Sequence, residues 1–151
     1  MPLFSNRSDG FTLIELLIVI VIIATAAVVA GPNISTGRST AELKSGARDI
    51  ASALRYVRGQ ALITHKDALF TINLENNSYR VSGRKKKFQI AKEIDITLVT
   101  AQSELTGDGQ GRIRFFADGS STGGRVTLEI GESKRIVDVN WLTGQIEINE
   151  E

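Results

Sequence analysis

The chain has 151 residues, which is the length of about one domain, and its 42% hydrophobic and 23% charged residues are typical of a globular protein. This composition excludes a collagen, a mucin-like stalk or a wholly disordered tail, and the net charge of +1 does not indicate a strongly electrostatic nucleic-acid binder. There is no cysteine and a single histidine, His65, so disulfides and thiolate metal sites are excluded, and no metal or cofactor is expected.

The first predicted element is the apolar stretch 11–30, in which 17 of 20 residues are hydrophobic. A helix with a rise of about 1.5 Å per residue makes this stretch about 30 Å long, which matches the hydrocarbon core of a bilayer. The stretch therefore predicts a membrane-spanning helix or a long signal sequence. Arg7 in the short polar flank favours a cytoplasmic N-terminus.

An ordinary secretory signal peptide is the alternative, with Ala24-Thr25-Ala26 as its small-residue cleavage site. Two features oppose it. The carboxylate of Glu15 lies inside the apolar run, where it is costly unless it is neutralised or paired, and the run continues beyond Ala26 to Ala30.

Glu15 has no basic partner nearby in its own chain, because no lysine or arginine lies between Arg7 and Arg38. Its partner must therefore come from elsewhere. A cut between Gly10 and Phe11 would create an α-amino group that is mostly cationic at neutral pH. In a bundle of parallel copies, Glu15 of one helix would pair with the Phe11 amine of its neighbour and fix their axial offset, as a polar residue fixes register in a coiled coil.

The run Gly10-Phe11-Thr12-Leu13-Ile14-Glu15, followed by a long apolar helix, resembles the class III signal of type IV pilins and type II secretion pseudopilins. The resemblance implies that prepilin peptidase cleaves between Gly10 and Phe11 and that the new N-terminal Phe11 is N-methylated. It also implies that Glu15 is the glutamate at the fifth mature position. Pro32 matches the proline at the twenty-second mature position, where the helix kinks or locally melts.

Gly31 and Pro32 are expected to break the helix, because proline lacks a donor and clashes with the preceding turn. An amphipathic helix is predicted to restart at Ser39 or Thr40 and to run to about residue 64. Its apolar stripe recurs at steps of three and four: Leu43, Ala47, Ile50, Leu54, Val57 and Ala61.

The same stretch, residues 33–66, carries six basic residues against two acidic ones, and this basic face has two interpretations. It is either a solvated helix face or a contact surface for acidic neighbours or lipid head groups. His65 falls at the expected helix end, where a cation suits the helix dipole, and no nucleophile or metal-ligand spacing accompanies it.

From residue 68 the hydrophobic period changes from that of a helix to that of strands. About eight short strands are predicted, with a tight hairpin at Thr143-Gly144 between the last two. They are expected at 69–74, 79–81, 88–90, 94–99, 113–116, 126–130, 136–142 and 145–148. One long helix followed by a run of strands predicts an α+β fold, with one or two antiparallel sheets packed on the helix.

Two loops of this half were considered as sites. The basic run 84–87 is interpreted as a solvated hairpin tip, with a nucleic-acid patch as the alternative. Aromatic residues do not alternate with it, and residues 67–151 carry 11 basic and 13 acidic residues, so nucleic acid is not expected as a partner. The loop 107–111 is not a phosphate loop, and its single Asp108 falls short of the acidic density of an EF-hand.

The stretch 115–126 is predicted as strand, turn and strand, in which Asp118-Gly119 allows a positive φ. Together with 137–144 it resembles the C-terminal domain of the H-type minor pseudopilins of type II secretion, a family that also includes the fimbrial T-type minor pilins of type IV pili. The residues of this head motif are Phe116, Asp118, Gly119, Ser120, Gly123, Gly124, Trp141 and Gly144.

The resemblance implies a pilin-like fold with four parts: a cleaved leader at 1–10, a transmembrane helix at 11–31, an amphipathic periplasmic helix at 32–66 and a β-rich head at 67–151. It implies a single-pass protein of the bacterial inner membrane, with a cytoplasmic N-terminus and a periplasmic head. The expected partners are other minor and major pseudopilins, the inner-membrane assembly platform and prepilin peptidase.

The implied function is that of a minor pseudopilin, a structural subunit at or near the tip of the type II secretion pseudopilus that supports export of folded proteins across the outer membrane. No catalytic residue is expected. One alternative is a minor pilin of a type IV pilus that serves assembly, adhesion or DNA uptake. An alternative of another class is a membrane-anchored periplasmic enzyme.

Overall fold

A computed structural model describes residues 11–107 and 109–150, with the side chains of residues 27–36 and of Arg38 outside the description. The chain divides into two units, residues 1–38 and residues 39–151. Each unit is described by itself.

In the first unit, the helix α1 (Leu13–Thr64) begins two residues after Phe11, and the described side chains from Leu13 to Ala26 are exposed. The helical assignment includes Gly31 and Pro32, while a kink or local melting at this place stays a prediction. Among the described residues, no helix meets the length and hydropathy that crossing a membrane requires.

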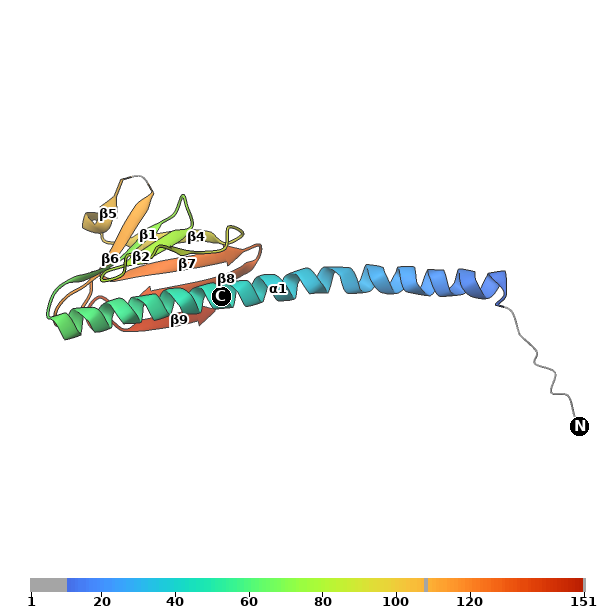
Figure 1. Ribbon diagram of the computed structural model, residues 1–151, viewed down its shortest axis with the longest axis horizontal. Coiled ribbons are helices and arrows are strands. Elements are labelled where there is room, and N and C mark those ends of the chain that lie inside the picture. Colours follow the sequence, from blue (N-terminus) through green and yellow to red (C-terminus); the bar gives the residue numbers. More distant parts are fainter. Residues whose placement is uncertain (1–10, 108, 151) are drawn as a thin grey trace, which may run out of the picture. The chain divides into compact units, whose positions relative to one another are not determined.

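In the second unit, α1 continues through Ser39 and Thr40, so the helix start that was expected at one of these residues is not found. The predicted apolar stripe is confirmed, because its six residues are at most 1% exposed. Ala51, also fully buried, widens the stripe by one position. This part of α1 runs along the sheets of the head (Figure 1).

Nine strands and one short 3-10 helix follow in the described part of the chain. Their bounds are β1 (Ala68–Asn73), β2 (Ser78–Val81), β3 (Phe88–Gln89), β4 (Asp95–Thr100), η1 (Gln102–Glu104), β5 (Leu105–Thr106), β6 (Gln110–Phe115), β7 (Gly124–Ile130), β8 (Ser133–Val139) and β9 (Ile146–Glu150). Burial alternates strictly along β1 and β6, as expected of strands with one face on a core.

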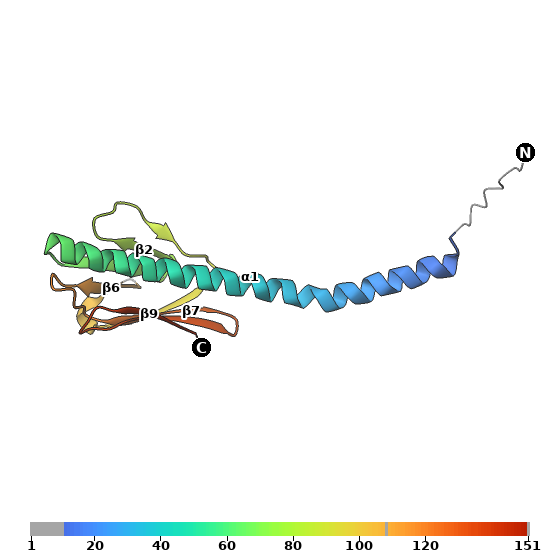
Figure 2. The ribbon, with the colours of Figure 1, turned by 90° about the horizontal axis from the view of Figure 1, so that it is seen from below.

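The strands form two antiparallel sheets, one of five strands in the order β3-β2-β1-β6-β5 and one of four in the order β4-β7-β8-β9. In Figure 2 the β2 side of the head lies on one side of α1, and β7 and β9 lie on the other. One core joins the helix and the two sheets, and its fully buried members include Ile50 and Leu54 of the helix, Phe70 and Phe115 of the first sheet, and Val126 of the second.

Two details differ from the sequence-based expectation. Strand β5 and the 3-10 helix η1 were not predicted, because neither Leu105–Thr106 nor Gln102–Glu104 shows an alternation of apolar and polar residues that is long enough to indicate an element. The tight hairpin at Thr143-Gly144 was wrong: β8 ends at Val139, and a six-residue loop, 140–145, leads into β9. The backbone N–H of Asn140 donates to the carbonyl of Gln145 at 2.9 Å and closes the loop. Inside the loop, the amide oxygen of Asn140 accepts hydrogen bonds from the backbone N–H groups of Leu142 (2.9 Å) and Thr143 (3.0 Å).

Candidate functional site

The N-terminal motif forms the first turn of α1. Thr12 stands at the N-cap position: its hydroxyl accepts a hydrogen bond from the backbone N–H of Glu15 at 3.3 Å, and its carbonyl accepts the N–H groups of Glu15 and Leu16. Glu15 lies three residues after this cap, where a negative charge is favoured by the helix dipole. Phe11 is 79% exposed, and Gly10, with the predicted cleavage site, lies outside the described residues.

The carboxylate of Glu15 is exposed, and it has no hydrogen bond or ion pair within the described part of the chain. Sequence reasoning identified Glu15 but missed the cap at Thr12, although the pattern Thr-x-x-Glu before an apolar run was the available signal. The cap satisfies the backbone N–H of Glu15. It leaves the side chain available for a group on another molecule.

The head motif begins with a tight turn after β6. The N–H of Phe116 donates to the carbonyl of Ser120, and the N–H of Gly119 donates to the carbonyl of Phe116, both at 2.9 Å. The carboxylate of Asp118 accepts hydrogen bonds from the Ser120 hydroxyl at 2.6 Å and from its backbone N–H at 2.9 Å. These two hydrogen bonds lower the pKa of Asp118 below its usual range. Asp118 is therefore a turn former, as predicted, and Gly119 has the expected positive φ of 86°.

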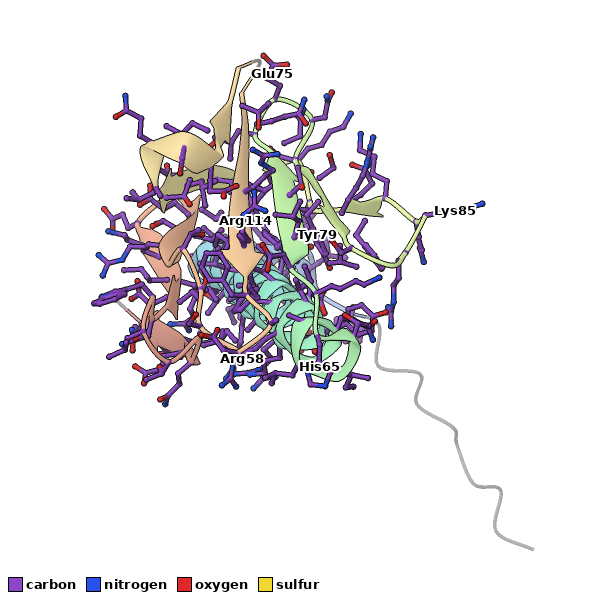
Figure 3. The ribbon with its side chains drawn as sticks, turned by 90° about the vertical axis from the view of Figure 1, so that its left-hand side faces the viewer. Arg58, His65, Glu75, Tyr79, Lys85 and Arg114 are labelled. Atoms are coloured by element: carbon purple, nitrogen blue, oxygen red, sulfur yellow. The ribbon has the colours of Figure 1, made fainter. Side chains whose placement is uncertain are left out.

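The same turn is bound to the helix end and to the loop after β8. Arg58 on α1 donates from Nε to the carbonyl of Gly119 at 3.2 Å and from its terminal nitrogen to the carbonyl of Thr143 at 3.0 Å. A Cβ added to Gly144, which has a φ of 64°, would collide with the carbonyl oxygen of Gly119. The motif glycines Gly119 and Gly144 thus let two loops, far apart in sequence, approach the guanidinium of Arg58, whose place at the helix end Figure 3 shows.

The second half of the motif holds Trp141 against the start of β7. The N–H of Ser121 donates to the carbonyl of Trp141 at 2.9 Å, and a Cβ on Gly123 (φ 73°) would lie 2.9 Å from the Cβ of Trp141. The backbone of Trp141 is therefore tightly seated, yet the residue is 66% exposed. Trp141 lines a cleft of about 450 Å³ together with Val99, Arg125 and Asp138.

Part of the basic face of α1 binds backbone carbonyls of the head, which the sequence analysis did not predict. Arg55 donates to the carbonyl of Ile146 at 3.4 Å, and Arg58 donates to the two loop carbonyls described above. Two of the six basic residues thus fasten the head to the helix. His65 ends the helix in the left-handed conformation (φ 52°), and it is exposed.

The basic run 84–87 lies in the loop between β2 and β3, as the hairpin interpretation predicted, and all four residues are exposed. Figure 3 shows Lys85 at the tip of this loop, pointing away from the sheets. Aromatic side chains do gather at the run in space: the Arg84 guanidinium lies 4.0 Å from the ring centroid of Tyr56, and the Lys86 ammonium lies 5.2 Å from that of Phe88. Sequence spacing could not reveal this, because Tyr56 comes from α1.

One buried carboxylate escaped the sequence analysis. Glu104 of η1 is 4% exposed and lies between two arginines of β6, with its Oε1 at 2.9 Å from Nε of Arg114 and its Oε2 at 3.2 Å from Nε of Arg112. Arg114 also approaches Asp67 at 3.6 Å. The hydrogen bond to Glu104 is the main reason why the pKa of Arg114 is raised. This cluster ties the loop after β4 to β6, so its role is structural.

Among residues 11–107 and 109–150, no group of three or more histidine, aspartate or glutamate side chains is arranged to hold a metal ion. Asp108, whose loop falls short of the acidic density of an EF-hand, lies outside the described residues.

Comparison with known proteins identifies the family. The family model described as type II transport protein GspH matches residues 46–144, which include the whole head motif and end on Gly144. The chain belongs to the GspH family. A second family model, the prokaryotic N-terminal methylation motif, matches residues 5–31.

Individual relatives agree with this assignment. A type II secretion system protein H of Xanthomonas campestris pv. campestris is 34% identical over 145 residues, which cover 96% of this chain and 85% of that protein. The fold is similar to that of the minor pseudopilin EpsH from the type 2 secretion system of Vibrio cholerae, with a TM-score of 0.58, 9% identity, and coverage of 72% of this chain and 97% of that one. It is also similar to the type IV minor pilin FimU of Pseudomonas aeruginosa, with a TM-score of 0.55, 14% identity, and coverage of 74% and 90%.

Proposed function

We propose that this GspH-family chain is a minor pseudopilin, a structural subunit at or near the tip of the type II secretion pseudopilus that supports export of folded proteins across the outer membrane. The observation that carries the proposal is the family match over 46–144, which is joined by a 34% identical relative that bears the name type II secretion system protein H. The matched range contains Arg58, Gly119 and Gly144, and it therefore covers the contacts that join two loops of the head to α1.

The proposed membrane anchor is the apolar stretch 11–30. The methylation motif at 5–31 and the family suggest a membrane-anchored protein. The finer topology is our proposal: a single pass through the inner membrane, with the N-terminus in the cytoplasm and the head in the periplasm. Prepilin peptidase would cleave between Gly10 and Phe11 and methylate the Phe11 amine. The bend proposed at Gly31-Pro32 would let the head adjust to its neighbours.

We propose that assembly of the subunit into the filament depends on the negative charge of Glu15. Its carboxylate has no partner in the described part of its own chain, and a buried carboxylate in an apolar filament core requires one. The amine of Phe11 in a neighbouring major or minor pseudopilin supplies this partner and sets the axial offset between subunits. The inner-membrane assembly platform would bring the two together.

The head is proposed to act by contact rather than by catalysis. The described residues of its motif form a turn, a clamp on the helix end and a seat for Trp141, and these are structural tasks. The membrane-anchored enzyme is therefore not favoured.

The test is a gene deletion, with exoprotein activity measured in the medium and in the periplasm. Retention of exoproteins in the periplasm, reversed by the wild-type gene, is the expected result. Normal secretion with lost twitching or lost DNA uptake would contradict the proposal and would make the chain a type IV minor pilin, the alternative with which the FimU-like fold is also compatible.

A further inference from the structure

A second surface of the head, which shares no residue with the cleft of Trp141, has the properties of a binding site. A cleft of about 700 Å³ lies between α1 and the β2–β3 connection. The helix contributes Asp49, Ser52 and Tyr56 to its lining, and the loop contributes Arg84, Lys86 and Lys87. None of these residues belongs to the leader or to the head motif. The cleft therefore needs an explanation of its own.

The cleft has an aromatic floor. The ring of Tyr79 stacks between Phe70 (centroids 5.4 Å apart) and Phe88 (5.1 Å), and Tyr79 is only 7% exposed. Two of the loop cations lie over rings at the cleft, Arg84 over Tyr56 and Lys86 over Phe88. Holding long basic side chains in place before binding reduces the conformational entropy that a ligand must overcome.

Ion pairs within the described part of the chain do not neutralise the positive charge of the cleft. In the part of the chain that is described, none of the four residues 84–87 forms an ion pair, whereas Arg112, Arg114, Arg125 and Arg135 of the same head do. Three cations line the cleft against one carboxylate, that of Asp49. An anionic ligand is the chemistry that this arrangement recognises.

The rest of the head limits the size of that ligand. Residues 67–151 carry 11 basic and 13 acidic residues, so without the four cations of the run there are seven basic and 13 acidic residues, a net charge of −6. A long polyanion that follows the surface beyond the cleft would meet this negative field, whereas a short acidic segment would stay within the basic island.

We propose that the cleft between α1 and the β2–β3 loop binds a short acidic polypeptide segment of a neighbouring subunit. Carboxylates of the segment accept hydrogen bonds from Arg84 and Lys86, which stay over the rings of Tyr56 and Phe88. An aromatic or aliphatic side chain beside the carboxylates packs against the edges of these rings. The neighbouring subunit as the source of the segment rests on the proposed function. The chemistry of the cleft does not.

The experiment measures peptide binding to the full chain in phosphatidylcholine nanodiscs by fluorescence anisotropy. The probe is a short capped, labelled peptide that alternates glutamate and phenylalanine, compared with the same peptide containing glutamine. The test variant is Arg84→Glu/Lys86→Glu, with the milder Arg84→Gln/Lys86→Gln as a second variant. The matched control is Lys44→Glu/Lys92→Glu, which reverses two exposed charges outside the cleft. Circular dichroism checks the fold of each variant.

We expect the glutamate peptide to bind, and the glutamine peptide and the test variant to bind at least about tenfold more weakly, with the control nearly unchanged. Asp49→Asn should tighten binding, because it removes the one opposing charge. Equal binding of both peptides, or equal losses in test and control variants, would overturn the proposal. So would preferential binding of a single-stranded oligonucleotide of equal charge, or binding that requires phosphatidylglycerol in the disc. Since no secretion is measured, this result stands or falls separately from the deletion experiment.

Discussion

At the scale of single residues, Glu15 has a local task in the first turn of α1 and, under the proposed function, an intermolecular task in assembly. Its backbone N–H is bound by the cap at Thr12, while its carboxylate has no partner in the described part of the chain. The two tasks separate by mutation, because one depends on the Thr12 hydroxyl and the other on the Glu15 charge.

We predict that Glu15→Ala is still cleaved but is not incorporated into filaments, because cleavage depends on Gly10 and assembly depends on the carboxylate. Thr12→Ala is the matched control: it removes the cap, at a cost of about 1 kcal/mol of helix stability, but keeps the charge, so it should assemble. Immunoblots report processing, and cross-linking to other pilin-like subunits reports assembly. A bulky residue in place of Gly10 should block processing. Normal assembly of Glu15→Ala would remove the register argument.

Gly144 depends on its lack of a side chain. Its positive φ and the approach of the Gly119 carbonyl leave no space for a Cβ. Gly144→Ala should therefore lower the free energy of unfolding by at least about 1–3 kcal/mol, measured by denaturant titration with circular dichroism. Gly107→Ala, at a position where an added Cβ meets nothing within 4 Å, should change it by less than about 0.5 kcal/mol. Equal effects of the two would contradict the steric explanation.

The pKa of the Tyr79 phenol is a measure of burial and charge at the cleft between α1 and the β2–β3 loop. Burial raises the pKa of Tyr79 above its ordinary value, and the nearby negative charge of Asp49 raises it further. The folded state thus favours the neutral phenol over the phenolate. Its contribution to the free energy of unfolding is fully present below the pKa of about 10 that Tyr79 has in the unfolded chain. It is lost as the pH rises through the higher pKa of the folded state. Tyrosinate absorbance in a Tyr56→Phe background isolates Tyr79, because the chain has two tyrosines. Asp49→Asn should lower the measured pKa but leave it above the ordinary value. No change would disprove the role of Asp49.

At the scale of elements, α1 in the second unit is held by its buried stripe. Ile50 is 0% exposed and Ile63 is 76% exposed on the same helix. Ile50→Ala should cost about 2–5 kcal/mol of unfolding free energy through lost burial and the remaining cavity, whereas Ile63→Ala should cost less than about 0.5 kcal/mol. Thermal or denaturant unfolding measures both. A comparable loss in the two variants would mean that the helix does not dock through this face.

The elements that sequence could predict are those with a strong period. The stripe from Leu43 to Ala61 and the alternation along β1 were predictable, because each repeats a burial pattern over many residues. The loop 140–145 was mistaken for a tight hairpin, because Thr143-Gly144 carries a turn signal whereas the bonding of Asn140 depends on side-chain geometry. Strand β5, with one apolar and one polar residue, has no repeating pattern by which it could be predicted.

At the scale of the whole chain, residues of the head motif make contacts with α1 that the sequence could not predict. Gly119 and Gly144 were predicted as members of the head motif, while Arg58, which joins their loops to the helix, was assigned only to a basic face. The same limit applies to the aromatic floor beside the run 84–87. Such contacts join positions far apart in the chain, and no local pattern encodes them.

Trp141 is the only tryptophan of the chain, and its backbone is fixed while 66% of its surface meets water. We therefore expect the intrinsic fluorescence of the native protein to have the emission of a solvated indole. Unfolding should shift this emission little, which makes fluorescence a poor measure of stability for this protein. Any molecule that covers the cleft lined by Trp141, Val99 and Arg125, in contrast, should shift the emission to shorter wavelength. The chain thus carries a built-in optical probe of docking at that cleft.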